Sequence, residues 1–191
     1  MGLDYFAVLQ QPRRPWLDPE QLKREYQRLT FERHPDRADA PSQGLNFAEV
    51  NQAYRVLSNP KMRLEHLLSL EASVSQTSEV PAEIADAFMD TASLVNQIDE
   101  LLQRRQAAAS VLAKSILRNE VSAMQQRATV TLNSLDKLHA DALHTLQQLD
   151  ERWISDRART VPELGRLAQR FGYLDRWIGQ LREKQFQLAS E

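Results

Sequence analysis

The sequence predicts an all-α protein, and three observations support this prediction. Apolar residues recur at spacings of three and four almost everywhere along the 191 residues, which is the period of an amphipathic helix. Runs of β-branched residues with strict apolar and polar alternation, which would indicate strands, are absent from the sequence. Only five glycines are present. A hydrophobic fraction of 42% and a charged fraction of 26% are those of an ordinary globular chain, so we expect a buried core.

A short helix and then a longer one are expected at the N-terminus. The short one spans residues 4–10 and ends at the prolines that follow. The longer one begins at Asp18-Pro19-Glu20-Gln21, which combines an N-cap residue, a proline at the first helical position and a glutamine three residues after the cap. It should run from Pro19 to about Arg33. One of its sides is apolar and another is basic or polar, with Leu22, Tyr26 and Leu29 on the first and Lys23, Arg24, Gln27 and Arg28 on the second.

A loop with His34-Pro35-Asp36 follows this helix. The residue before a proline is biased away from the helical region, so the helix should end near Arg33 and the loop should extend through Ser42. A third helix is expected from about residues 43–45 to Ser58, and a short fourth helix from Lys61 to Leu70. The prediction is therefore an antiparallel pair of longer helices joined by the His-Pro-Asp loop, with short helices at both ends.

Residues 71–81, EASVSQTSEVP, lose the helical period and predict a linker. Three long periodic stretches follow, and the simplest packing for them is an antiparallel three-helix bundle. We expect Pro162 and the preceding residues 157–160 to separate the second stretch from the third. Whether the second stretch is one helix from Ala107 to Trp153 is left open. The predicted domains are residues 1–72, a linker of residues 73–82, and a helical C-terminal domain of residues 83–191.

The composition excludes several kinds of site. The chain has no cysteine, which rules out disulfides and thiolate ligands. Its four histidines are scattered, and His139 and His144 are five residues apart, so no metal site is expected. Phosphate-binding glycine-rich loops and nucleophile elbows are absent from the sequence. We expect no cofactor and no enzymatic activity of the chain itself.

The charge pattern and hydropathy suggest where the protein works. The net charge of −2 gives no overall attraction to nucleic acid, so nucleic-acid binding is not expected. No run of 18 apolar residues is present, and the first ten residues lack the features of a secretion signal. We therefore expect a cytoplasmic protein that is not in the membrane.

Three segments together resemble a J-domain. They are residues 22–29 (LKREYQRL), residues 34–37 (HPDR) and residues 47–58 (FAEVNQAYRVLS). The tripeptide alone is a weak signal, but its place after a capped basic helix and before an AYxVL helix makes it specific. Asp4-Tyr5-Phe6 and residues 60–70 (PKMRLEHLLSL) are in addition similar to the HscB family of iron–sulfur cluster assembly, and the likeness extends to residues 171–188.

The resemblance implies a co-chaperone that stimulates the ATPase of a specialised, HscA-like Hsp70 and delivers an IscU-like iron–sulfur cluster scaffold protein as its client. Asp36 would offer a carboxylate to an arginine of the Hsp70, Pro35 would fix the loop and His34 would add a donor. Basic residues of the second helix would steer the encounter. The expected Hsp70-binding residues are His34, Pro35, Asp36, Lys23, Arg24, Gln27, Arg28 and Arg37. Gln27 stands where many J-domains have a lysine.

The client-binding face implied by the resemblance lies on the first helix of the C-terminal domain. The residues expected there are Asp86, Phe88, Met89, Asp90, Ala92, Asn96 and Glu100. Phe88 and Met89 are adjacent, so one core-facing stripe cannot easily bury both. Ala92, Ser93 and Asn96 stand where the family has larger or acidic residues.

Other interpretations stay open at this point. His34-Pro35-Asp36 could be a turn that ends a helix and caps the next segment, and the charges of the second helix could be a solvated face paired with its glutamates. The six acidic residues between Glu79 and Gln103 could pair with the basic last helix inside one bundle. The alternative functions are a J-domain protein with a different client, or a helical interaction protein with a vestigial J-domain.

Overall fold

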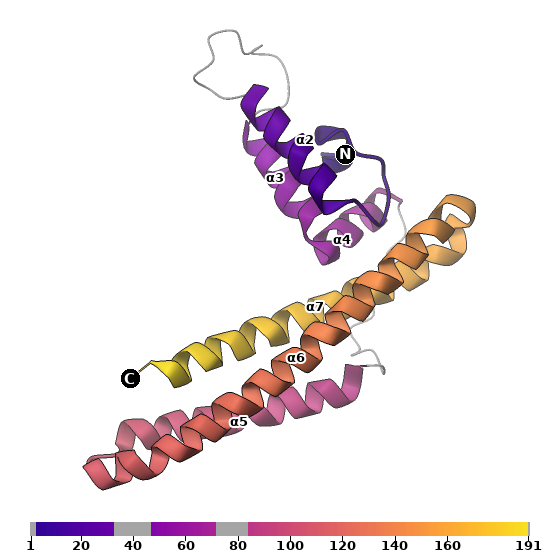
Figure 1. Cartoon of the computed structure of the whole chain (residues 1–191). Coiled ribbons are helices and arrows are strands. Elements are labelled where there is room, and N and C mark those ends of the chain that lie inside the picture. Colours follow the sequence, from indigo (N-terminus) through magenta and orange to yellow (C-terminus); the bar gives the residue numbers. More distant parts are fainter. Residues whose placement is uncertain (1–2, 33–46, 72–83, 191) are drawn as a thin grey trace. The chain divides into compact units, whose positions relative to one another are not determined.

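The computed structural model describes residues 3–32, 47–71 and 84–190 (Figure 1). Within these residues the chain forms seven α-helices and no β-strand, which confirms the prediction of an all-α fold. None of these helices combines the length and the hydropathy that a membrane span requires. The chain divides into two compact units. The first comprises Met1–Ser78 with Leu143–Gln169, and the second comprises Glu79–Ala142 with Arg170–Glu191.

The first two helices begin at capping aspartates, of which Asp18 is predicted from the sequence. Helix α1 is Tyr5–Val8, and the Asp4 carboxylate accepts the N–H of Phe6 at 3.0 Å. Helix α2 is Pro19–Glu32, and the Asp18 carboxylate accepts the N–H of Gln21 at 2.7 Å. A cap of this kind satisfies one of the backbone donors that the first helical turn leaves without a partner.

Helices α3 (Phe47–Ser58) and α4 (Pro60–Leu70) complete the N-terminal part. Asn59 separates them and caps α4, because its side-chain oxygen accepts the N–H of Met62 at 2.9 Å. Helix α3 packs against α1, α2 and α4, and it runs antiparallel to α2 in Figure 1. The fully buried side chains of this core come from all four helices and include Phe6, Leu29, Val50, Ala53, Leu57, Leu64 and Leu67.

Three long helices follow: α5 (Ala85–Ala107), α6 (Val111–Ser155) and α7 (Arg157–Ala189). Helix α6 is continuous over 45 residues, which answers the question that the sequence left open. Both α6 and α7 contribute to both units. The linker predicted at residues 73–82 lies outside the described residues, so the domain boundaries stay predictions.

The expected break at residues 157–160 is wrong, because these residues are the first turn of α7. The break is at Asp156 alone, whose carboxylate accepts the N–H of Arg159 at 3.2 Å and whose carbonyl accepts the Thr160 hydroxyl at 2.6 Å. Pro162 stands inside α7. A proline in the second turn removes a single backbone hydrogen bond, and the capped turn before it holds the helix together.

The loop between α1 and α2 is fixed by side chains from distant parts of the first unit. The Asp150 carboxylate, from α6, accepts the N–H of Trp16 at 3.0 Å and forms an ion pair with Arg14. The Trp153 indole donates to the carbonyl of Arg13 at 3.1 Å. Asp150 is only 5% exposed, so these bonds compensate for the loss of water around a buried charge.

A buried arginine of α4 holds the same loop from another direction. Arg63 is 3% exposed and donates to the carbonyl of Pro15 at 2.8 Å and to that of Leu57 at 2.6 Å. Burial lowers the pKa of Arg63 to about 10, and the charge of Asp150 partly opposes this shift. The side chain therefore remains cationic at neutral pH and can donate a hydrogen bond to each of the two carbonyls.

Replacing Arg63 by methionine should lower the free energy of unfolding by roughly 2–4 kcal/mol, because two carbonyls lose a charged donor while the apolar packing of the side chain is kept. Urea unfolding followed by circular dichroism measures the change. Arg55→Met is the matched control, since Arg55 is exposed on α3 and the same substitution there should change stability by less than about 0.5 kcal/mol. Equal effects in both variants would contradict the role given to Arg63.

A histidine joins α1 to α4. The Nε2 atom of His66 accepts the N–H of Tyr5 at 3.0 Å, and its ring stacks on Phe6 with the centroids 5.6 Å apart. A protonated Nε2 has no lone pair for this bond. Burial lowers the pKa of His66, and the neighbouring Asp4 opposes the shift only in part.

The stability of the protein should therefore fall as the pH drops below about 6.5, where the unfolded chain binds a proton that folded His66 resists. Thermal unfolding between pH 7.5 and 5.5 measures the slope. His66→Gln should flatten it, because a glutamine does not titrate. His144→Gln, at an exposed position on α6, should keep the slope of the wild type. A His66→Gln slope equal to that of the wild type would disprove the coupling.

Candidate functional site

The His34-Pro35-Asp36 motif and Arg37 lie outside the described residues. The structure describes the helix that leads to the motif and the helix that follows it. Leu22 and Leu29 anchor α2 in the core with less than 3% exposure. Tyr26 ties α2 to α3, because its hydroxyl bonds the side-chain oxygen of Asn51 at 2.8 Å and its ring stacks on Tyr54 at 4.1 Å between centroids. The pair of helices that flanks the motif is therefore rigidly joined.

The opposite side of α2 carries the residues predicted to bind the Hsp70. Lys23, Arg24, Gln27 and Arg28 are all exposed. Arg24, Gln27 and Arg28 share one side of the helix with Phe31, which lies seven residues after Arg24 and is 69% exposed. Sequence reasoning missed Phe31, although its spacing from Arg24 places it on the same side. The surface is thus basic with one aromatic residue at its end.

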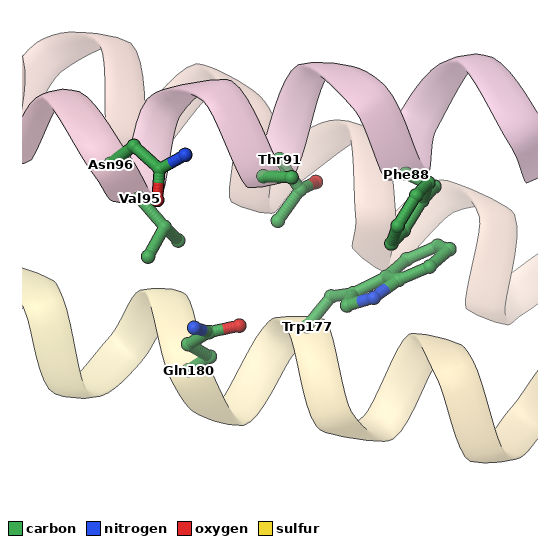
Figure 2. Close-up of a pocket in the computed structure, with 7 residues that line it drawn as sticks. Phe88, Thr91, Val95, Asn96, Trp177 and Gln180 are labelled. Atoms are coloured by element: carbon green, nitrogen blue, oxygen red, sulfur yellow. The ribbon is translucent and has the colours of Figure 1, made fainter.

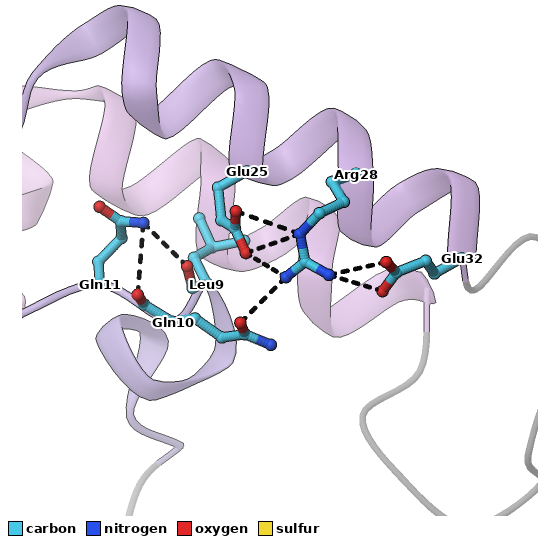
Figure 3. Close-up of polar contacts among 6 residues, drawn as sticks. All are labelled: Leu9, Gln10, Gln11, Glu25, Arg28 and Glu32. Atoms are coloured by element: carbon cyan, nitrogen blue, oxygen red, sulfur yellow. Dashed lines mark hydrogen bonds and ion pairs between the residues drawn. The ribbon is translucent and has the colours of Figure 1, made fainter.

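Arg28 is already held by neighbouring side chains (Figure 3). Its guanidinium forms an ion pair with Glu25, donates to the Glu32 carboxylate at 2.7 Å and 2.9 Å, and donates to the Gln10 side chain at 3.0 Å. Hydrogen bonds from Arg28 lower the pKa of Glu25, so this carboxylate stays ionised. Lys23 and Arg24 form no ion pair among the described residues. They are the cations of α2 that a partner can contact without breaking such a network.

The seven residues predicted to bind the client are all exposed on α5, but they do not share one face. Phe88, Ala92, Asn96 and Glu100 follow one another at four-residue spacing, and Met89 lies beside Phe88, with 66% exposure. Asp86 and Asp90 are each two residues from Phe88, which is about 200° around a helix. The structure therefore separates these two carboxylates from the stripe that begins at Phe88.

A pocket of about 130 Å³ lies between α5 and α7, within the second unit (Figure 2). Its lining consists of Phe88, Thr91, Ala92, Val95, Asn96, Trp177 and Gln180. The Phe88 ring lies against the Trp177 indole, with the centroids 5.6 Å apart. Trp177 is only 4% exposed and forms part of the pocket wall.

Four of the lining residues were not predicted: Thr91, Val95, Trp177 and Gln180. For Trp177 the signal was present, since residues 174, 177, 178 and 181 have the spacing of one helical face. No such spacing in the sequence marks Thr91 or Gln180, because the residues that surround them are determined by how α5 packs against α7. Among the described residues, no group of three or more His, Cys, Asp or Glu side chains could hold a metal ion.

Comparison with known families assigns the N-terminal part. The DnaJ domain matches residues 4–66. The match begins at the cap of α1, ends within α4 and includes both helices that flank His34-Pro35-Asp36. Residues 4–66 therefore match a DnaJ domain, and the chain as a whole is similar to HscB proteins.

The likeness to HscB proteins extends beyond the J-domain. The chain is 28% identical over 179 residues to "Co-chaperone protein HscB" of Proteus mirabilis (strain HI4320), covering 91% of this chain and 96% of that one. The solved structure "Chaperone HscB from Vibrio cholerae" has the same fold, with a TM-score of 0.56 and 19% identity over 97% of this chain and 99% of that one. The long helices after the J-domain are therefore part of the shared fold.

Proposed function

We propose that this J-domain protein is a co-chaperone that stimulates the ATPase of a specialised, HscA-like Hsp70 and delivers an IscU-like iron–sulfur cluster scaffold protein to it. The observation that carries the proposal is the position of His34-Pro35-Asp36 inside a DnaJ domain, directly after a helix with an exposed basic side. The HscB relatives, one named a co-chaperone and the other a chaperone, support the same function. We place this function in the cytoplasm.

The J-domain would act by binding alone. A protein that breaks no bond can accelerate a partner's ATP hydrolysis only if it binds the reactive conformation more tightly than the resting one. Asp36 would supply a carboxylate for bidentate pairing with an arginine of the Hsp70. Lys23 and Arg24 would raise the rate of encounter through long-range attraction to an acidic patch. The α2–α3 pair, joined through Tyr26, would hold Lys23 and Arg24 in a fixed relation to α3.

A second candidate function keeps the J-domain mechanism but changes the client. By the resemblance to the HscB family, larger or acidic residues are expected where this chain has Ala92 and Asn96. The client of this chain could therefore differ from that of other HscB proteins. Binding of the purified scaffold protein to the full chain distinguishes the two functions.

Asp36→Asn should abolish the stimulation of the Hsp70, because an amide cannot replace a carboxylate in bidentate pairing with arginine. Single-turnover ATP hydrolysis by each Hsp70 of the same cell, with and without the protein, measures the effect. We expect one Hsp70 to be stimulated at least about tenfold by the wild type, a barrier change of roughly 1.4 kcal/mol, and not by the variant. Failure of the folded wild-type protein to stimulate any Hsp70 would contradict the proposal.

Arg24→Gln should raise the concentration needed for half-maximal stimulation several-fold at low salt, and high salt should reduce the difference, because screening weakens long-range attraction. The same ATPase assay across a salt series provides the measurement. Arg118→Gln is the matched control, since it removes the same charge from an exposed position on α6. If both variants raise the half-maximal concentration equally, the effect comes from the net charge of the protein, and the role given to the α2 surface is contradicted.

A further inference from the structure

Arg28 has almost no hydrogen-bonding capacity left for a partner (Figure 3). A guanidinium has five N–H groups in a planar fork. In Arg28 the Nε–H donates to the Glu25 carboxylate at 3.2 Å, and one Nη1–H donates to the Glu32 carboxylate at 2.7 Å. The two N–H groups of Nη2 go to Glu25 and, at 3.0 Å, to the side-chain oxygen of Gln10. The single N–H that remains cannot form the parallel pair that bidentate binding of a partner's carboxylate requires.

The stability of α2 does not explain the pair between Arg28 and Glu32. Glu32 is the last residue of α2, where the partial negative charge of the helix end disfavours a carboxylate. The basic residue also precedes the acidic one by four positions, which is the less stabilising order for such a pair. Glu25 precedes Arg28 and has the favourable order. The position of Glu32 therefore indicates that its carboxylate acts on Arg28 and not on the helix.

The third acceptor belongs to a different element. Gln10 follows α1 and has a left-handed backbone φ of 53°, which residues other than glycine rarely adopt. Its backbone N–H bonds the carbonyl of Ala7 at 3.2 Å, so the turn after α1 holds it in this conformation. The guanidinium of Arg28 is thus held from α2 and from the turn after α1 together.

The same network cancels much of the positive charge of α2. The helix has three basic and three acidic residues, which are Lys23, Arg24, Arg28, Glu20, Glu25 and Glu32. Hydrogen bonds from Arg28 lower the pKa of Glu25, so this carboxylate is ionised at neutral pH. Arg28 with its two carboxylates is one cation against two anions. An acidic surface on a partner would therefore be attracted by Lys23 and Arg24 but not by this group.

We propose that Glu32, together with Glu25, withholds Arg28 from the Hsp70 and thereby weakens its binding to the J-domain. The inference rests on the proposed function, because it takes α2 to face the Hsp70. A carboxylate of the Hsp70 would have to displace existing partners before it could pair with Arg28. Recognition would then depend on Lys23 and Arg24, and an Hsp70 without acidic partners for these two cations would be rejected.

Glu32→Gln tests the proposal by removing one of the competing carboxylates. The concentration of the full chain needed for half-maximal stimulation of the Hsp70 ATPase should fall roughly three- to tenfold at low salt, because Arg28 becomes available to the Hsp70. If Glu32 instead positioned Arg28 for the Hsp70, the same substitution would raise this concentration.

Glu20→Gln is the matched control. It removes the same charge from an exposed position in the first turn of α2, where the carboxylate forms no ion pair among the described residues. The half-maximal concentration should change by less than about twofold, since a single exposed charge contributes little. Equal decreases for Glu20→Gln and Glu32→Gln would overturn the proposal, because the net charge of α2 would then be the cause.

A double-mutant cycle with Arg28→Gln shows whether Glu32 acts through Arg28. In the Arg28→Gln background, Glu32→Gln should no longer lower the half-maximal concentration, because there is no guanidinium to release. A decrease of the same size in both backgrounds would overturn the proposal and show that Glu32 only repels the Hsp70.

The outcomes distinguish this inference from the function on which it rests. A folded wild-type chain that stimulates no Hsp70 overturns the proposed function and the inference with it. Stimulation by the wild type, together with an unchanged or higher half-maximal concentration for Glu32→Gln, overturns the withholding of Arg28 alone. Circular dichroism of each variant establishes that the helices are intact.

Discussion

The buried carboxylate of Asp150 is the constraint on which the first unit depends. The loop between α1 and α2 has no helical hydrogen bonds, and its backbone groups must find partners elsewhere. Asp150 provides one by accepting the N–H of Trp16, and its ion pair with Arg14 balances the charge. Trp153 and Arg63 bond two further carbonyls of the same loop. Because this loop leads directly into the cap of α2 at Asp18, the same bonds determine where the basic helix of the J-domain begins.

The charges of α2 serve two different purposes. Arg28 forms bonds within its own helix and with Gln10, so moving it onto a partner would replace existing bonds instead of adding new ones. Lys23 and Arg24 lack such bonds among the described residues, and their positive charge reaches into the solvent within the Debye length of about 8 Å at physiological salt. A basic surface can therefore contain residues that order the helix and others that attract a partner. The two kinds of residue are both exposed, and only their hydrogen-bond and ion-pair partners distinguish them.

Local patterns predicted most of the fold, and long-range pairing explains what they missed. The cap at Asp18 predicted the start of α2, because a cap acts within three residues. The expected break near Pro162 was wrong because the Asp156 cap stabilises the turn before it. The buried positions of Arg63 and Asp150 could not be predicted, since charged residues are normally exposed and their partners are distant in sequence. The pocket was missed for the same reason: it exists only where α5 meets α7.

The two candidate surfaces rely on different physics. The α2 surface would work through charges that act over several ångströms, which favours fast encounter and allows quick release when the Hsp70 changes state. The pocket between α5 and α7 would work through close packing, which acts only on contact and depends on the shape of the group that enters it. The first property suits a brief trigger, and the second suits the recognition of one client. Because the surfaces belong to different compact units, each can change in sequence without altering the packing of the other. The exposed side of α2 and the lining of the pocket can therefore vary independently.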